Sequence, residues 1–108
     1  MVVIGTRPEA VKMSPIAQII RKDPEIEPLL CLTAQHRQMV DQILNLFQIK
    51  PDIDLNLMKE VQQLPEVTSS ILLSMNEVLK KTHPDWVLIQ GDTTTVMATA
   101  LAAFYNQV

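Results

Sequence analysis

The sequence predicts an α/β fold with a parallel, doubly wound sheet covered by helices. Short apolar runs alternate with segments of helical periodicity along all 108 residues, and no linker or low-complexity tract interrupts them. In such chains each strand leads through a right-handed helical crossover to the next, so that the strands are parallel. The length predicts one domain over residues 1–108.

The first half of the chain alternates twice between strand and helix. Val2–Ile4 predicts a short first strand, and Leu29–Thr33 predicts a second one, after Pro28. Between them a helix is expected to start with Ser14 as its cap and Pro15 in its first position, where proline is tolerated. The apolar face of this helix is expected to be Ile16, Ile19 and Ile20. The helix after the second strand is expected to turn inward Met39, Val40, Ile43, Leu44 and Phe47.

The second half continues the same alternation. The pattern "IKPDIDLNLM" predicts a short strand or an extended loop. A long helix is expected from about Pro65 until His83-Pro84 ends it, followed by a strand at Trp86–Ile89 in which Trp86 packs. A last, alanine-rich helix is expected at about Thr95–Asn106. The buried stripe of the long helix is expected to be Val67, Ile71, Met75, Val78 and Leu79.

Composition limits the classes of partner and environment. Hydrophobic residues make up 47% of the chain and charged residues 19%, which is typical of a soluble globular domain. The formal net charge of −3 gives no sign of a nucleic-acid or anionic-membrane partner. The one cysteine, Cys31, lies in an apolar run and predicts a free, buried thiol. Since neither a membrane span nor a secretion signal is visible, the expected location is the cytoplasm.

Only two glycines occur, Gly5 and Gly91, and each directly follows a predicted strand. This number excludes a glycine-rich dinucleotide fingerprint and a phosphate loop of the nucleotide-hydrolase kind, both of which need more glycines at fixed spacing. It also marks two places where the backbone could approach a ligand closely.

Polar and charged side chains follow three of the predicted strands. Arg7 and Lys12 follow the first, and these cationic groups together with the backbone N–H groups of a helix start suit a phosphate or a diphosphate. The alternative is a solvated helix start. After the last strand, Asp92 could bind a hydroxyl group, accept a proton or simply cap a helix. The second strand is followed by a polar group that could also be a loop capping a helix: Gln35, His36, Arg37 and Gln38.

The ends of parallel strands meet at one edge of the sheet, where such folds bind ligands. Four of these side chains can carry positive charge in a chain that is acidic overall. The convergence therefore favours an anionic, hydroxyl-bearing ligand such as a nucleotide sugar. No arrangement of His, Cys and acidic residues has the spacing of metal ligands, and no metal is expected.

Five motifs in this order and spacing resemble the non-hydrolysing UDP-N-acetylglucosamine 2-epimerases: "GTRPEAVKMSP", "TAQHRQM", "KPDIDLNLM", "GDTTT" and "ALAAFY". The resemblance implies a partial N-terminal Rossmann-like domain of a two-domain enzyme with the glycosyltransferase-B arrangement. It also implies interconversion of UDP-N-acetylglucosamine and UDP-N-acetylmannosamine for cell-surface polysaccharides, by elimination and re-addition of UDP. Members need no metal or redox cofactor, and the complete enzyme is expected to be a homodimer.

The resemblance also implies roles for individual residues. Arg7, Lys12 and Asp92 match positions that contact the substrate, and Asp92 also matches a position that supports catalysis. Val61 stands where many members have a cation, which predicts weaker regulation. The positions that match a second, regulatory site for UDP-N-acetylglucosamine are Gln35, His36, Gln38 and Gln62.

The family's catalytic glutamates, its histidine and its second domain have no counterpart before Val108, and the first strand lacks opening residues. The chain alone is therefore expected to be inactive. The alternatives are a non-catalytic UDP-sugar-binding module, one part of a split enzyme, or a degraded product that does not fold stably. A related hydrolysing enzyme remains a further alternative for the complete protein.

Overall fold

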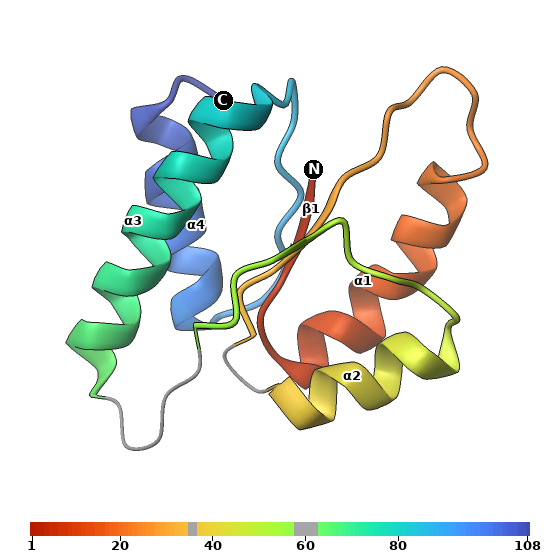
Figure 1. Cartoon of the computed structure of the whole chain (residues 1–108), viewed down its shortest axis with the longest axis horizontal. Helices are drawn as coiled ribbons and strands as arrows, with labels where there is room; N and C mark the ends of the chain where they lie inside the picture. The colour runs from red at the N-terminus through yellow and green to blue at the C-terminus, as the bar shows by residue number, and fades with distance from the viewer. Residues whose placement is uncertain (35–36, 58–62) are drawn as a thin grey trace.

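The structure, a computed structural model, describes residues 1–34, 37–57 and 63–108, and over these ranges helices flank a parallel sheet (Figure 1). This confirms the predicted α/β class. The elements in chain order are β1 (Val2–Ile4), α1 (Arg7–Ile20), β2 (Leu30–Leu32), α2 (Arg37–Leu46), β3 (Ile53–Asp54), α3 (Leu64–Thr82) and α4 (Thr94–Tyr105).

The sheet is parallel, and β1 lies in its interior. The hydrogen-bonded order is β1-β2-β3. On the other side of β1, Val2 forms a parallel bridge with Leu88, where the Leu88 amide donates to the Met1 carbonyl at 2.8 Å. Successive strands thus run outward in one direction to β3, and the chain then crosses back to the opposite side of β1. This reversal between β1 and the Leu88 segment is a topological switch point, the usual place for a ligand crevice in open α/β sheets.

The predicted strand at Trp86–Ile89 is wrong in extent. Only one bridge, at Leu88, connects this segment to β1 among the described residues. Trp86 is 76% exposed, so the expectation that it packs is also wrong. The physical reason is that the segment pairs with one neighbour only, and a single-sided pairing leaves its apolar residues without a second strand beside them.

Helices cover both faces of the sheet. Figure 1 shows α3 and α4 on one side and α1 and α2 on the other. Side chains alternate along β1: Val2 and Ile4 join the core under α1 and α2, whereas Val3 joins the core under α3 and α4. In β2, Leu30 and Leu32 likewise point to the first of these cores and Cys31 to the second. Because side chains alternate between two buried faces, every residue of β1 and β2 is apolar.

The first helix begins at Arg7, eight residues earlier than Pro15, which corrects the predicted start. Thr6 is the N-cap, Pro8 lies in the first turn and Pro15 lies inside the helix. Ile19 is 70% exposed, so the predicted isoleucine face is not the buried one. The buried face is built from small or flexible side chains that let the helix approach the sheet closely, namely Ala10, Met13 and Ala17.

The other helices follow their predicted patterns more closely. In α2, Val40 and Leu44 are buried, whereas Met39, predicted to face inward, is exposed. The start of α3 lies within one residue of Pro65, and His83 caps its end in the left-handed region at φ 44°. The fully buried stripe of α3 is Ile71, Met75 and Leu79, three of the five predicted positions.

Cys31 should not react with thiol reagents at neutral pH until the protein unfolds. It is fully buried, and this burial, followed by the charge of Asp54, raises the pKa of the Cys31 thiol from 9.0 to about 12. Because the folded pKa exceeds the unfolded one, the resulting stabilisation is complete below pH 9 and is lost as the pH rises towards 12. Labelling with an aromatic disulfide in increasing urea should follow the unfolded fraction. Rapid labelling of the native protein at pH 7 would contradict the prediction.

Candidate functional site

Three strand ends meet at the lower edge of the sheet in Figure 1, as the sequence predicted. Gly5, directly after β1, lies between Thr33 after β2 and Thr95 in the first turn of α4. A Cβ atom at Gly5 would lie only 2.4 Å from the Thr33 hydroxyl and 2.1 Å from the Thr95 hydroxyl. These two hydroxyl groups lie 3.1 Å from each other. The edge is therefore closely packed around a position that admits no side chain.

Glu9 connects the first and last of these strand ends. Its Oε2 accepts hydrogen bonds from the amides of Gly5 at 2.6 Å and Thr6 at 3.0 Å, while its Oε1 accepts one from the Thr93 hydroxyl. The Thr93 oxygen in turn accepts from the Val96 amide at 3.3 Å and thereby caps α4. Glu9 is not among the candidate residues predicted from the sequence. The T-x-x-E spacing of a capping box was the signal that could have found it.

This buried carboxylate changes how an anion could be bound at the start of α1. The amides of Gly5 and Thr6 already donate to it, and Pro8 has no amide hydrogen. The expectation that backbone amides there bind a phosphate is therefore wrong for these two groups. An anion at this helix start must rely mainly on cationic side chains.

Arg7 and Lys12 both lie on α1 and are exposed. Neither forms a hydrogen bond or ion pair with another described residue. A spacing of five residues turns their side chains about 140° apart around the helix axis. The two cations therefore do not form one cluster. A single ligand could contact both only by reaching around that side of α1.

Asp92 lies in the exposed turn between the Leu88 segment and α4. It follows Gly91, whose φ of 125° is open to glycine and strained for other residues. The N-cap of α4 is Thr93, so the alternative that Asp92 caps this helix is wrong. Among the described residues the Asp92 carboxylate has no partner. Its predicted roles as a hydroxyl ligand or proton acceptor stay predictions.

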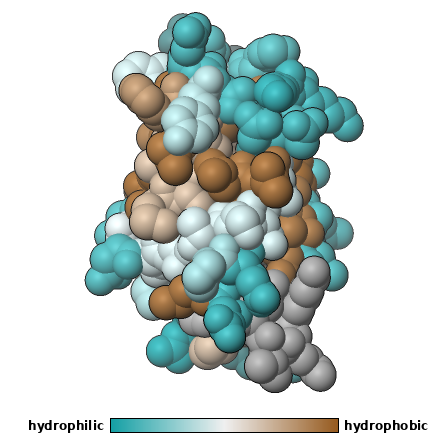
Figure 2. Space-filling view, turned by 90° about the vertical axis from the view of Figure 1, so that its left-hand side faces the viewer, coloured by the Kyte–Doolittle hydropathy of each residue, from teal (hydrophilic) through white to brown (hydrophobic). Residues whose placement is uncertain are grey.

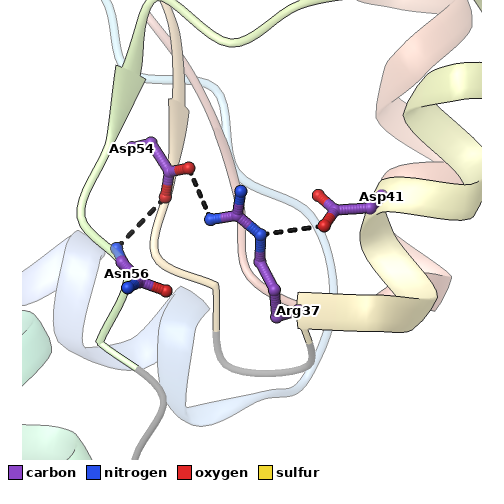
Figure 3. A network of polar contacts seen from close by, with 4 residues as sticks. All are labelled: Arg37, Asp41, Asp54 and Asn56. Carbon is purple, nitrogen blue, oxygen red and sulfur yellow. Dashed lines mark hydrogen bonds and ion pairs between the residues drawn. The ribbon is translucent and has the colours of Figure 1, made fainter.

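Arg37, counted among the cations of the predicted site, is held by two carboxylates (Figure 3). Its Nε donates to Asp41 at 2.9 Å, and its Nη1 donates to Asp54 at the end of β3. The backbone amide of Asn56 donates to the same Asp54 side chain at 3.1 Å. These bonds, first to Asp41 and then to Asp54, raise the pKa of Arg37 above its ordinary value. The network connects the start of α2 to β3. Because the two carboxylates neutralise Arg37, this side chain is not available to bind an anion.

The predicted regulatory positions are described only in part. Gln38 is exposed in the first turn of α2, beside Arg37. Three other predicted positions, Gln35, His36 and Gln62, lie outside the described residues, as does Val61.

A cavity of about 680 Å³ lies away from this edge, beside the starts of β1 and β2. Met1, Leu29, His83 and Trp86 are among its lining residues, and none of the predicted site residues contributes. In the described ranges no three His, Cys, Asp or Glu side chains gather in a way that could hold a metal ion. None of the helices described combines the length and apolar character needed to cross a membrane.

Comparison with known proteins identifies the family. The model for the family "UDP-N-acetylglucosamine 2-epimerase" matches residues 18–108. The chain belongs to this family. The UDP-N-acetylglucosamine 2-epimerase of Bacillus subtilis strain 168 is 56% identical over 108 residues, which are 100% of this chain and 28% of that protein.

Solved epimerase structures have the same fold over the matched region. The UDP-GlcNAc 2-epimerase of Neisseria meningitidis, bound to UDP-GlcNAc, superposes with a TM-score of 0.93 at 52% identity, over 98% of this chain and 29% of that one. The enzyme of Methanocaldococcus jannaschii, in complex with UDP-GlcNAc and UDP, gives a TM-score of 0.90 at 33% identity, over 98% of this chain and 29% of that one. The chain thus spans less than a third of these epimerases.

Proposed function

We propose that the protein carrying this chain is a cytoplasmic epimerase that interconverts UDP-N-acetylglucosamine and UDP-N-acetylmannosamine for cell-surface polysaccharides. The observation that carries the proposal is the strand edge at the switch point. There Arg7 at the start of α1 and Asp92 in the loop before α4 have no partner among the described residues, and Glu9 joins these two segments in a chain of the epimerase family. The bound UDP-GlcNAc of the Neisseria relative supports the choice of substrate.

Each residue has a role in this proposal. Arg7 and Lys12 bind the diphosphate of the substrate through charge-assisted hydrogen bonds. Asp92 binds a sugar hydroxyl or takes part in proton transfer at C2. In the reaction the C2 proton is removed, the C1–O bond breaks and UDP leaves; UDP then adds back at C1 and a proton returns to the opposite face of C2. The proposed regulatory site for a second UDP-N-acetylglucosamine consists of Gln35, His36, Gln38 and Gln62.

The 108 residues are proposed to be part of the N-terminal domain and to be inactive alone. The carboxylates and histidine that the family resemblance assigns to the proton transfers have no counterpart in the chain, so the described edge could bind a nucleotide sugar but not complete the reaction. The alternative is a UDP-sugar-binding module, which needs only the cations of this edge.

The complete enzyme is proposed to be a homodimer. Figure 2 shows the side of the molecule formed by α3 and α4, where hydrophobic residues gather between polar ones. Apolar side chains that gather on one face suit a subunit contact. The large hydrophobic residues exposed on these two helices are Leu64, Leu73, Met97, Leu101, Phe104 and Tyr105.

The test is epimerisation in deuterium oxide, with the protein as the cell makes it and UDP-N-acetylglucosamine as substrate. Deuterium at C2 and the appearance of UDP-N-acetylmannosamine are expected, and Asp92→Asn should lower both rates. The isolated 108-residue chain should incorporate no deuterium. UDP binding by calorimetry without any exchange in the cellular protein would favour the binding module. Absence of both binding and exchange would contradict both functions.

A further inference from the structure

The contact between Glu9 and Thr93 joins residues 84 positions apart in the chain. Glu9 is 1% exposed, and its two oxygens accept bonds from different loops. Oε2 accepts from the amides after β1, while Oε1 accepts from the hydroxyl that begins α4. A shift of either loop would therefore leave a buried polar group without its partner, which is strongly unfavourable.

The alternative is that each of the two residues only caps its own helix. Glu9 completes a capping box at the start of α1, and Thr93 caps α4. A second observation shows that the loops are also packed together: a Cβ atom at Gly91 would lie 3.7 Å from Glu9 Cγ and 3.9 Å from Glu9 Oε1. The backbone of the last loop thus rests against the Glu9 side chain, beyond the single hydrogen bond.

We propose that Glu9 and Thr93 are positioning residues that set the place of Asp92 relative to Arg7. Arg7 lies two residues before Glu9 at the rigid start of α1, and Asp92 directly precedes Thr93. Through the shared carboxylate, the Asp92 backbone is held to the same helix start that carries Arg7. This inference rests on the proposed function, since it assumes that Arg7 and Asp92 act on one substrate.

Thr93→Val tests the contact because valine keeps the shape of threonine and removes the hydroxyl. In the protein as the cell makes it, amide hydrogen exchange at Gly5 and Thr6, whose amides donate to Glu9, should become about tenfold faster, the effect of losing one buried hydrogen bond that holds this carboxylate. The kcat for epimerisation should fall about tenfold with little change in KM, since Asp92 is misplaced while the diphosphate contacts remain. Thr93→Ser, which keeps the hydroxyl, should restore both values.

Two further variants separate positioning from helix capping and from general stability. Thr99→Val removes a buried hydroxyl on the same helix that has no hydrogen-bond partner among the described residues, so neither loop exchange nor kcat should change. In a Glu9→Ala background, Thr93→Val should have little additional effect on kcat, because the shared contact is already absent. If Glu9→Ala does not fold, the comparison of Thr93→Val with Thr93→Ser decides alone.

The outcomes distinguish this inference from the proposed function. Unchanged exchange at Gly5 and Thr6 in Thr93→Val, or a kcat loss that Thr93→Ser does not restore, would overturn the positioning role. If the wild-type protein shows no epimerisation, the proposed function fails. The exchange measurement would still support or overturn the contact between the two loops.

Discussion

Replacing Gly5 with alanine should destabilise the protein by about 3 kcal/mol or more, a large effect for a single methyl group. The new Cβ would lie 2.1 Å from Thr95 Oγ1, 2.4 Å from Thr33 Oγ1 and 2.8 Å from Thr95 Cβ. Threonine is stiff at χ1, so these atoms cannot turn away freely. Relief would require moving β1 from β2 or α4 from the sheet. Urea unfolding monitored by circular dichroism would measure the loss.

Gly91→Ala is the matched control for this prediction. A Cβ atom there meets nothing closer than 3.7 Å, but the φ of 125° is strained for alanine. Its cost should be about 1–3 kcal/mol and should arise from backbone conformation alone. Gly5→Ala should exceed it and should also disturb the packing of both threonines. A Gly5→Ala protein within 1 kcal/mol of the wild type would show that the strand edge is less tightly packed than described.

Arg7→Met should weaken UDP binding by about 10- to 100-fold, the range for losing charge-assisted hydrogen bonds to a phosphate. The start of α1 offers few other donors to an anion, because Glu9 already accepts hydrogen bonds from the amides of Gly5 and Thr6. Arg7→Lys should give an intermediate affinity, since it keeps the charge but loses the planar two-pronged donor. Isothermal titration calorimetry with UDP at two salt concentrations would measure both the affinity and its dependence on salt.

Lys22→Met provides the control for the loss of one positive charge. Lys22 is an exposed residue just after the far end of α1, and it has no hydrogen-bonding or ionic side-chain partner among the described residues. Its substitution should leave UDP affinity within about twofold, because the separation exceeds a Debye length at physiological salt. Equal losses in both variants would mean that Arg7 acts only through net charge. Unchanged binding in Arg7→Met would remove Arg7 from the proposed site.

The long third helix illustrates what local sequence signals can predict. Its start near Pro65 and its end at His83-Pro84 follow from the positions of the two prolines. The stripe of Ile71, Met75 and Leu79 follows from helical spacing. The glycines were informative for a similar reason. Gly5 and Gly91 each follow a predicted strand, and both lie where the backbone is closely approached or has positive φ.

Local signals misled where long-range packing decides. Ser14-Pro15 resembles a helix start, yet the helix begins at Arg7, where the capping box of Thr6 and Glu9 lies beside the last loop. The isoleucines of that helix have the right spacing for a buried face. Even so, the small residues Ala10 and Ala17 are the ones that allow α1 to approach the sheet closely.

By itself the sequence determined the α/β class, the order of most elements, the family and the edge of the sheet where the strand ends meet. These depend on residue periodicity, turn chemistry and motif spacing, all of which are local along the chain. The tertiary structure alone decided which charges remain available. Asp54, 17 residues from Arg37, neutralises that cation, and Thr93, 84 residues from Glu9, shares its carboxylate. Pairings across such separations depend on how the strands are ordered in space, which no local pattern specifies.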